Sequence, residues 1–386
     1  MPAWLRHPAV IAAGGFLAIR GFGLLALLLS PARDRPLIEV LGIWDGGWYV
    51  RIAESGYADH LDLSQPDSDQ STGSLAFFPV YPLLMRLLSA ITGLDSRWAG
   101  VILSLAAGAL AAAGIAALAR DWRGDRVGVL AALLWACSPM AVVGALVYTE
   151  ALFTALAVWT FVALRHDRWW LAAGLGFAAG LARPTGIAVG TAVAAWALWT
   201  YWHRRPRDRD VDSSWRAGVG VLLAGAVALA GTPTFWLWVG VRADRWDGWF
   251  AAQEAFWGSQ FDGGAATLIL VEDVILGDTR AGSELLSLAV VCALLTAVVL
   301  LILAIRGRVW WPLLVYGGVS LVMIIGGAGY FSSKLRFLVP LFVLAFPLAR
   351  WLSARSRAIR TLVILAAVAG GTASGTWMLL SWPYAI

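Results

Sequence analysis

Long runs of apolar residues recur along most of this chain, and they constrain its fold more than any other feature. A bilayer core about 30 Å thick requires about 20 consecutive apolar residues from each helix that crosses it. Windows that approach or exceed this length lie at residues 8–30, 98–119, 127–147, 150–164, 169–203, 217–240, 285–305, 309–329, 335–350 and 361–382. The sequence therefore predicts an all-α polytopic membrane protein, a single transmembrane domain over residues 1–386 with about 11 spans (10–12).

The composition agrees with this prediction. Hydrophobic residues make up 60% of the chain and charged residues only 14%, whereas soluble domains average about 45–50% apolar and about 25% charged residues. A cytosolic enzyme, a disordered chain and a nucleic-acid-binding protein are excluded on this basis. We assign the net charge of +5 to basic residues in cytoplasmic loops, not to a nucleic-acid partner.

Basic connections between the apolar runs predict the orientation of the chain. They contain Arg120, Arg123 and Arg126; Arg165 and Arg168; the stretch 204–216; Arg306 and Arg308; and Arg350, Arg355, Arg357 and Arg360. All can be cytoplasmic, as the positive-inside rule favours, if 169–203 crosses twice and 77–92 does not cross completely. The N-terminus is then cytoplasmic and the C-terminus external. If 77–92 does cross, several basic loops lie outside.

Two acidic segments then face the extracytoplasmic side, and we expect the chemistry there. The first outer loop, 31–97, is expected to carry juxtamembrane helices and the catalytic residue, and the second outer loop covers 241–284. Cys137 and Cys292 lie in apolar runs and the four histidines are scattered, so we expect no metal and no cofactor. The sequence has no phosphate-binding glycine loop, so no motif in it supports nucleotide-driven transport.

Asp45 is the candidate catalytic residue. It stands between Trp44 and Gly46, shortly after the first apolar run ends. In a cleft walled by aromatic side chains, desolvation would raise the pKa of such a carboxylate towards useful base strength. The alternative is an interfacial amphipathic helix for which Asp45 is the N-cap. Composition alone does not separate these two interpretations.

Three basic residues are candidates for binding a phosphate. Arg183 lies at the predicted helix break before Pro184, where the N-terminus of the next helix adds partial positive charge. Lys334 and Arg336 form a second basic cluster on the same outer face, against the general trend of the charges. The alternative for Arg183 is an arginine that snorkels at a loop. Glu150 also falls on an outer turn, where helix capping is the favoured interpretation.

A further group of residues is expected to contact the sugar or the acceptor. Gln253 and Trp257 are one helical turn apart and share a face, an arrangement that suits a sugar but equally anchors a loop helix. Tyr81 follows Phe77-Phe78-Pro79 at the start of the next segment, where an interfacial tyrosine on a proline-initiated helix is the alternative. The full set of candidates is Trp44, Glu54, Tyr81, Gln253 and Trp257.

The order and spacing of these elements resemble a known family. Trp44-Asp45-Gly46, Phe77-Phe78-Pro79 and Arg183-Pro184-Thr185-Gly186, followed by Gln253 with Trp257 and by Arg336-Phe337, are similar to the GPI mannosyltransferase II (PIG-V-like) family and its bacterial members. The resemblance implies a GT-C glycosyltransferase, a membrane-embedded enzyme with a polyprenyl-phosphate-sugar donor, typically mannose. The family's acidic residue in the first outer loop maps onto Asp45.

The resemblance also implies a reaction and a location. We expect Asp45 to take the proton from an acceptor hydroxyl as that oxygen attacks the anomeric carbon, an inverting single displacement, with the donor phosphate held by Arg183 and by Lys334 or Arg336. The lysine-poor, arginine-rich chain indicates a bacterial inner-membrane protein, and its glycan, glycolipid or protein acceptor is not specified by the sequence. The alternatives are a transporter or lipid flippase without transferase activity, and a non-catalytic membrane scaffold.

Overall fold

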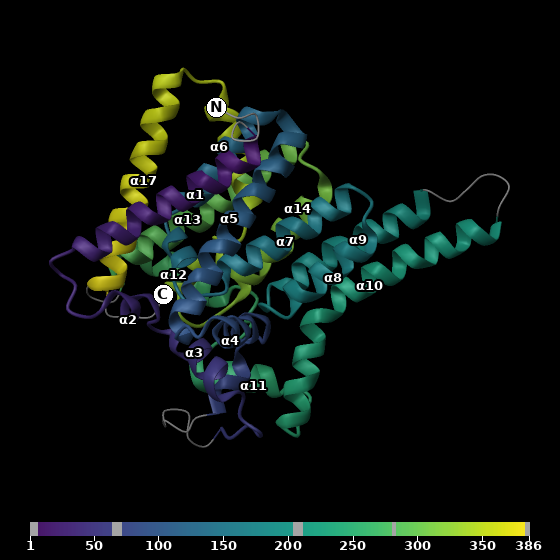
Figure 1. Cartoon of the computed structure of the whole chain (residues 1–386), viewed down its shortest axis with the longest axis horizontal. Coiled ribbons are helices and arrows are strands. Elements are labelled where there is room, and N and C mark those ends of the chain that lie inside the picture. Colours follow the sequence, from purple (N-terminus) through teal and green to yellow (C-terminus); the bar gives the residue numbers. More distant parts are fainter. Residues whose placement is uncertain (1–6, 64–71, 204–210, 280–282, 383–386) are drawn as a thin grey trace.

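Helices make up almost all of the structure, a computed structural model that describes residues 7–63, 72–203, 211–279 and 283–382 (Figure 1). Part of the basic connection expected at 204–216 lies outside these residues. Within them, the β-structure consists of one isolated bridge between Phe261 and Gly327. The helices, in chain order, are α1 (Pro8–Leu29), α2 (Leu37–Leu41), α3 (Asp45–Ser55), α4 (Val80–Thr92), α5 (Ser96–Arg123), α6 (Asp125–Ala136), α7 (Glu150–Arg165), α8 (Trp169–Gly180), α9 (Gly186–His203), α10 (Val211–Arg242), α11 (Gly248–Trp257), α12 (Ala265–Leu276), α13 (Glu284–Arg306), α14 (Trp311–Gly326), α15 (Ser333–Phe337), α16 (Ala345–Ser353) and α17 (Arg357–Leu380). Short 3₁₀ segments cover η2 (Thr72–Ala76), η3 (Ala141–Ala145) and η4 (Phe342–Leu344).

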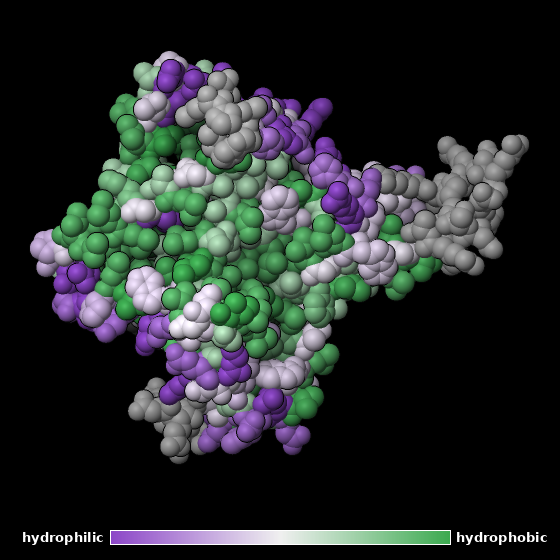
Figure 2. Space-filling view, in the orientation of Figure 1, coloured by the Kyte–Doolittle hydropathy of each residue, from purple (hydrophilic) through white to green (hydrophobic). Residues whose placement is uncertain are grey.

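The prediction of an all-α membrane bundle is confirmed. Five helices among the described residues are long and apolar enough to cross a bilayer: α1, α5, the Gly218–Arg242 part of α10, α13 and α17. Figure 2 shows a broad apolar band between two polar ends of the molecule. Many further apolar helices are shorter than a full span, so the predicted number of about 11 spans is not confirmed by helix length.

The described residues of 31–97, the predicted first outer loop, form short helices, which gather at one end of the bundle. Figure 1 shows α3 and α4 together with α11 at this end, whereas the start of α17 lies at the opposite end. Helix α4 has 13 residues and is therefore about 20 Å long, which is too short to cross a hydrocarbon core unaided. Its Leu83, Leu87 and Ile91 side chains form an exposed apolar stripe, as expected for a helix that lies at a membrane boundary.

The long apolar run 169–203 is broken at the predicted position. Helix α8 ends at Gly180 and α9 begins at Gly186, so the turn between them contains Arg183 and Pro184. Both helices pack against α10. Gly180 permits this close approach, because a Cβ atom there would lie 2.6 Å from the backbone nitrogen of Thr232 in α10. Small residues at helix contacts allow such backbone approach in membrane proteins.

The run 335–350, expected as one span, is instead divided into three pieces: α15, η4 and α16. Pro340 lies between α15 and η4 and removes a backbone donor where a helix would have to continue. Its carbonyl oxygen accepts a hydrogen bond from the Tyr316 hydroxyl at 2.9 Å. The run 127–147 is divided similarly, since α6 ends before Pro139 and η3 follows. Apolar composition alone does not reveal such breaks.

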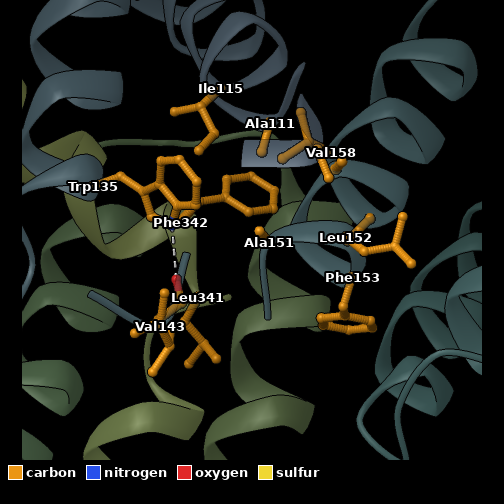
Figure 3. Close-up of a cluster of buried hydrophobic side chains, with 14 of the residues drawn as sticks. Ala111, Ile115, Trp135, Val143, Ala151, Leu152, Phe153, Val158, Leu341 and Phe342 are labelled. Carbon is orange, nitrogen blue, oxygen red and sulfur yellow. Dashed lines mark hydrogen bonds between the residues drawn. The ribbon is translucent and has the colours of Figure 1, made fainter. Parts of the chain in front are cut away.

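A buried core connects the late pieces of the chain to the early helices. Ile115 in α5, Trp135 in α6 and Val158 in α7 lie around Phe342 in η4 (Figure 3). The indole Nε1 of Trp135 donates to the carbonyl of Val339 at 2.9 Å, which ties the segment after α15 to α6. The core therefore fixes α15, with its two basic residues, relative to the helices that carry the first outer loop.

The contact at Gly180 gives a stability prediction. We expect Gly180→Ala to lower the stability of the purified protein by about 1–3 kcal/mol, because the added methyl group meets the backbone of α10. Reversible denaturation in mixed detergent micelles measures the change. Gly174→Ala in the same helix is the matched control: a Cβ atom there meets nothing within 4 Å, so this variant should be as stable as the wild type or more stable. Equal effects of the two substitutions would contradict the proposed close contact.

Candidate active site

A cavity of about 320 Å³ opens where the outer segments meet the bundle. Its lining comes from α3, η2 and the residues after it, the α8–α9 turn, α11, the end of α14 and α15. Seven of the residues predicted from the sequence line it: Trp44, Asp45, Arg183, Gln253, Trp257, Lys334 and Arg336. These residues are spread over almost 300 positions of sequence, and the fold brings them to one space.

Asp45 is the first residue of α3 and is held there by a constrained backbone. Trp44 before it has φ of 53° and ψ of −120°, a sparsely populated conformation for a residue with a side chain, of the kind that clusters at functional sites. A Cβ atom on Gly46 would lie 3.3 Å from the carbonyl of Val147, and Val147 donates its N–H to Leu41 at 2.9 Å. The start of α3 is thereby fixed against the segment that precedes α7.

Asp45 belongs to a chain of alternating charges. Arg336 Nη1 lies 2.6 Å from Asp45 Oδ2, and Arg336 Nε lies 3.3 Å from Glu150 Oε1. The same Glu150 oxygen lies 2.6 Å from Arg183 Nη1, which also donates to Thr149 Oγ1 at 2.8 Å. The two guanidinium groups thus share the single atom Glu150 Oε1, and Asp45 joins the group through Arg336.

Burial differs strongly along this chain of charges. The Glu150 side chain is 1% exposed, those of Arg336 and Arg183 are 8% and 10% exposed, and that of Asp45 is 23% exposed. Asp45 is therefore the member that reaches the open space, and Glu150 lies behind the two arginines. The Phe337 ring covers both guanidinium groups, at 5.4 Å from Arg183 and 5.1 Å from Arg336, which provides cation–π stabilisation on a desolvated face.

Lys334, the only lysine in the sequence, lines the same cavity. Its ammonium group donates to the carbonyls of Ile324 and Gly327 at the end of α14, which satisfies acceptors that a helix C-terminus leaves unpaired. Burial lowers the pKa of Lys334. Asp262, in the second outer loop, accepts hydrogen bonds from the N–H groups of Ala266 and Gly264, and these bonds lower the pKa of its carboxyl group.

Aromatic side chains form the wall opposite the basic residues. Trp48 in α3 stacks on Phe77 with ring centroids 5.6 Å apart, and Trp257 in α11 meets both rings edge-on at 5.8 and 5.3 Å. Gln253 Nε2 donates to the carbonyl of Ala76 at 3.2 Å. Gln253 and Trp257 therefore share a face as their spacing predicted, and this face joins the second outer loop to the first.

Two predicted contact residues lie away from the cavity. Tyr81 is fully buried, and its hydroxyl contacts the Gly100 carbonyl at 2.9 Å and Ser104 Oγ at 2.8 Å, which makes it a packing residue between α4 and α5. Glu54 is exposed near the end of α3, where its backbone carbonyl accepts a hydrogen bond from Arg86. Neither side chain lines the space beside Asp45.

Glu150 is the residue whose position the sequence reasoning undervalued. It is the first residue of α7 and follows the N-cap Thr149, and its side chain does not cap the helix as expected but pairs with Arg183 and Arg336. The available signal was an acidic residue beside an apolar run, which is a functional candidate by default.

Among the described residues, no three His, Cys, Asp or Glu side chains come together as a metal-binding group.

Comparisons with known proteins agree with the fold. A sequence profile of the family described as dolichyl-phosphate-mannose-protein mannosyltransferase matches residues 74–238, a region that contains Glu150 and Arg183 but not Asp45. None of the curated proteins compared matches the chain.

Solved structures of membrane glycosyltransferases share the architecture. The apo oligosaccharyltransferase of Archaeoglobus fulgidus aligns over 97% of this chain and 56% of its own, with a TM-score of 0.54 and 13% identity. ArnT from Cupriavidus metallidurans bound to undecaprenyl phosphate aligns over 92% and 62%, with a TM-score of 0.51 and 17% identity. The chain thus spans little more than half the length of these proteins, and it has a GT-C-type fold.

A third structure extends the comparison to a liganded state. The archaeal oligosaccharyltransferase AglB from Archaeoglobus fulgidus, in complex with an inhibitory peptide and a dolichol-phosphate, aligns over 98% of this chain and 56% of its own, with a TM-score of 0.52 and 14% identity. At these levels of identity the similarity describes the fold alone.

The buried position of Arg336 gives a second prediction. Arg336→Met removes the guanidinium group that bridges Asp45 and Glu150, and we expect a loss of about 3–5 kcal/mol because a buried carboxylate loses a partner. Arg245→Met is the matched control: Arg245 lies 2.6 Å from Asp247, but these side chains are 43% and 31% exposed, so the loss should be much smaller than for Arg336→Met. Unfolding titrations in mixed micelles provide the measurement, and similar losses would show that burial does not matter here.

Proposed function

We propose that this protein is a GT-C glycosyltransferase that moves a sugar from a polyprenyl-phosphate donor to an acceptor hydroxyl on the extracytoplasmic side of a bacterial inner membrane. One observation carries the proposal: a carboxylate, Asp45, and three basic side chains line a single cavity whose other wall is aromatic. This combination offers a proton acceptor, a binding site for a phosphate and stacking surfaces for a sugar ring.

The basic side chains suit the phosphate of such a donor. Guanidinium groups bind phosphate oxygens through charge-assisted, often bidentate hydrogen bonds, and Arg183 and Arg336 both line the cavity. Lys334 adds a third positive charge on the same side. Because the Arg183 and Arg336 side chains are largely buried, these charges stabilise the negative charge that develops on a departing phosphate more than they would in solution.

The reaction we propose is a single displacement at the anomeric carbon. The acceptor oxygen forms a bond to this carbon while the bond from the carbon to the phosphate oxygen breaks. The bonding electron pair leaves with the phosphate, which departs as polyprenyl phosphate, and the acceptor proton passes to Asp45. Because the attack comes from the face opposite the phosphate, the configuration inverts, and a β-linked donor yields an α-linked product.

Mannose is the sugar that we propose. The support is the match to the dolichyl-phosphate-mannose-protein mannosyltransferase profile over residues 74–238, together with the PIG-V-like order of motifs along the sequence. Trp48, Phe77 and Trp257 offer the rings on which an apolar sugar face can stack. The acceptor belongs to the glycans, glycolipids or proteins of the outer face, and the lipid tail of the donor lies among the helices. The proposed orientation leaves the N-terminus in the cytoplasm, and the proposal requires neither a metal nor a cofactor.

Sugar transfer in reconstituted membranes tests this function. Proteoliposomes that contain the full chain receive radiolabelled polyprenyl-phosphate-mannose and a bacterial envelope extract as the acceptor source. We expect transfer of label by the wild type and a loss of about 10²–10⁴-fold in Asp45→Asn, because this substitution removes the general base. Asp247→Asn, at an exposed outer position, is the matched control and should transfer normally.

Two results would contradict the proposal in different ways. Near-normal transfer by Asp45→Asn shows that another group takes the proton. Movement of the labelled lipid across the bilayer without transfer identifies a flippase or transporter instead of a transferase.

A further inference from the structure

Arg336 is shared between two carboxylates that face opposite directions. Asp45 meets Arg336 from the cavity side and is 23% exposed, whereas Glu150 meets it from the interior and is 1% exposed. The shorter contact, 2.6 Å, is the one to Asp45, and the contact to Glu150 is 3.3 Å. Arg336 therefore has one partner that an entering molecule can reach and one that it cannot.

The interior partner holds the arginines independently of Asp45. Glu150 Oε1 lies within 2.6 Å of Arg183 and 3.3 Å of Arg336. Besides its ion pair with Glu150, Arg183 donates a hydrogen bond to Thr149, the residue directly before Glu150. Arg336 lies over the Tyr148 ring at 5.0 Å. If Asp45 moved away, these contacts would still keep both guanidinium groups at the back of the cavity.

The contact between Arg336 and Asp45 conflicts with the chemistry proposed for both residues. While Asp45 Oδ2 accepts the hydrogen bond from Arg336 Nη1 at 2.6 Å, this oxygen is occupied and does not face an acceptor hydroxyl. A donor phosphate that binds Arg336 also meets the negative charge of Asp45 beside it. Both difficulties disappear if the phosphate takes the place of Asp45 on Arg336.

We propose that the Arg336–Asp45 pair is an exchangeable contact and that Glu150 is a positioning residue that keeps Arg336 in place during the exchange. This inference rests on the proposed function. The phosphate of the donor replaces Asp45 on Arg336, and the carboxylate of Asp45 turns to the acceptor hydroxyl. Donor binding thus precedes activation of the acceptor, so the site does not deprotonate a hydroxyl or water while it is empty.

Binding of radiolabelled undecaprenyl phosphate to the full chain in nanodiscs tests the exchange. Asp45→Asn removes the competing charge but retains the shape, so we expect about tenfold tighter binding, together with the loss of transfer. Asp247→Asn, the exposed control, should bind as the wild type does. Unchanged or weaker binding by Asp45→Asn would overturn the exchange, because Asp45 would then not compete with the phosphate.

A double-mutant cycle tests the role of Glu150. Glu150→Gln removes the second carboxylate charge beside Arg336, so Asp45 holds this arginine more firmly. Asp45→Asn should then gain at least about threefold more affinity for undecaprenyl phosphate in the Glu150→Gln background than in the wild type. If Glu150→Gln only loosened the site, it would lower the affinity for undecaprenyl phosphate equally with and without Asp45. An equal gain from Asp45→Asn in both backgrounds would therefore overturn the positioning role of Glu150. Glu150→Asp retains the charge and should show a gain close to that of the wild type, and Glu272→Gln, exposed in α12, controls for the substitution.

The outcomes of these experiments distinguish this inference from the proposed transferase function on which it rests. A wild-type chain that neither binds undecaprenyl phosphate nor transfers mannose overturns both. A wild type that binds and transfers, with no gain in Asp45→Asn, overturns the exchange alone and leaves the proposed transferase in place.

Discussion

The ion pairs around Glu150 are the interaction on which the rest of the site depends. They join four segments that are far apart in the sequence: the start of α3, the start of α7, the α8–α9 turn and α15. The core already fixes α15 relative to the bundle, and the ion pairs define how the charged side chains of these segments meet. Both guanidinium groups contact the same buried oxygen atom, Glu150 Oε1, and Asp45 joins them through Arg336.

Burying four charges near a membrane is costly, and the structure reduces the cost in identifiable ways. The charges alternate and sum to zero, so no uncompensated charge is desolvated. Aromatic rings cover the guanidinium faces, and the N-terminus of α7 adds partial positive charge beside Glu150. Such a group contributes less to stability than apolar residues of the same volume would. The presence of this group therefore agrees better with the binding role proposed for these charges than with a role in stability alone.

The sequence was informative where the signal is local. The break at Arg183-Pro184 follows from a proline inside an apolar run, and the face shared by Gln253 and Trp257 follows from helical spacing. Asp45, Lys334 and Arg336 stood out because charge is scarce in this chain. The sequence was uninformative where the answer depends on a distant partner. Glu150 is interpreted as a helix cap until Arg183 and Arg336 are placed beside it, and Tyr81 as interfacial until its hydroxyl is placed between the Gly100 carbonyl and Ser104 Oγ.

The two walls of the cavity are connected through the second outer loop, and this connection makes the aromatic wall part of the same unit. Ala76 accepts hydrogen bonds from Trp249 and Gln253 of α11 at 3.1 and 3.2 Å, which ties the loop to the first outer segment. Ala328 donates to Gln260 at 2.8 Å, which ties it to the segment between α14 and α15.

The second outer loop is therefore connected both to Trp257 and to the backbone that Lys334 binds. Lys334 is bound to the carbonyls of Ile324 and Gly327, and Gly327 pairs with Phe261 of the loop. The pairs around Glu150, by contrast, connect elements of the bundle and do not pass through this loop. The charged base built on Glu150 and the wall connected to the outer loop therefore meet in α15, which carries both Arg336 and Lys334.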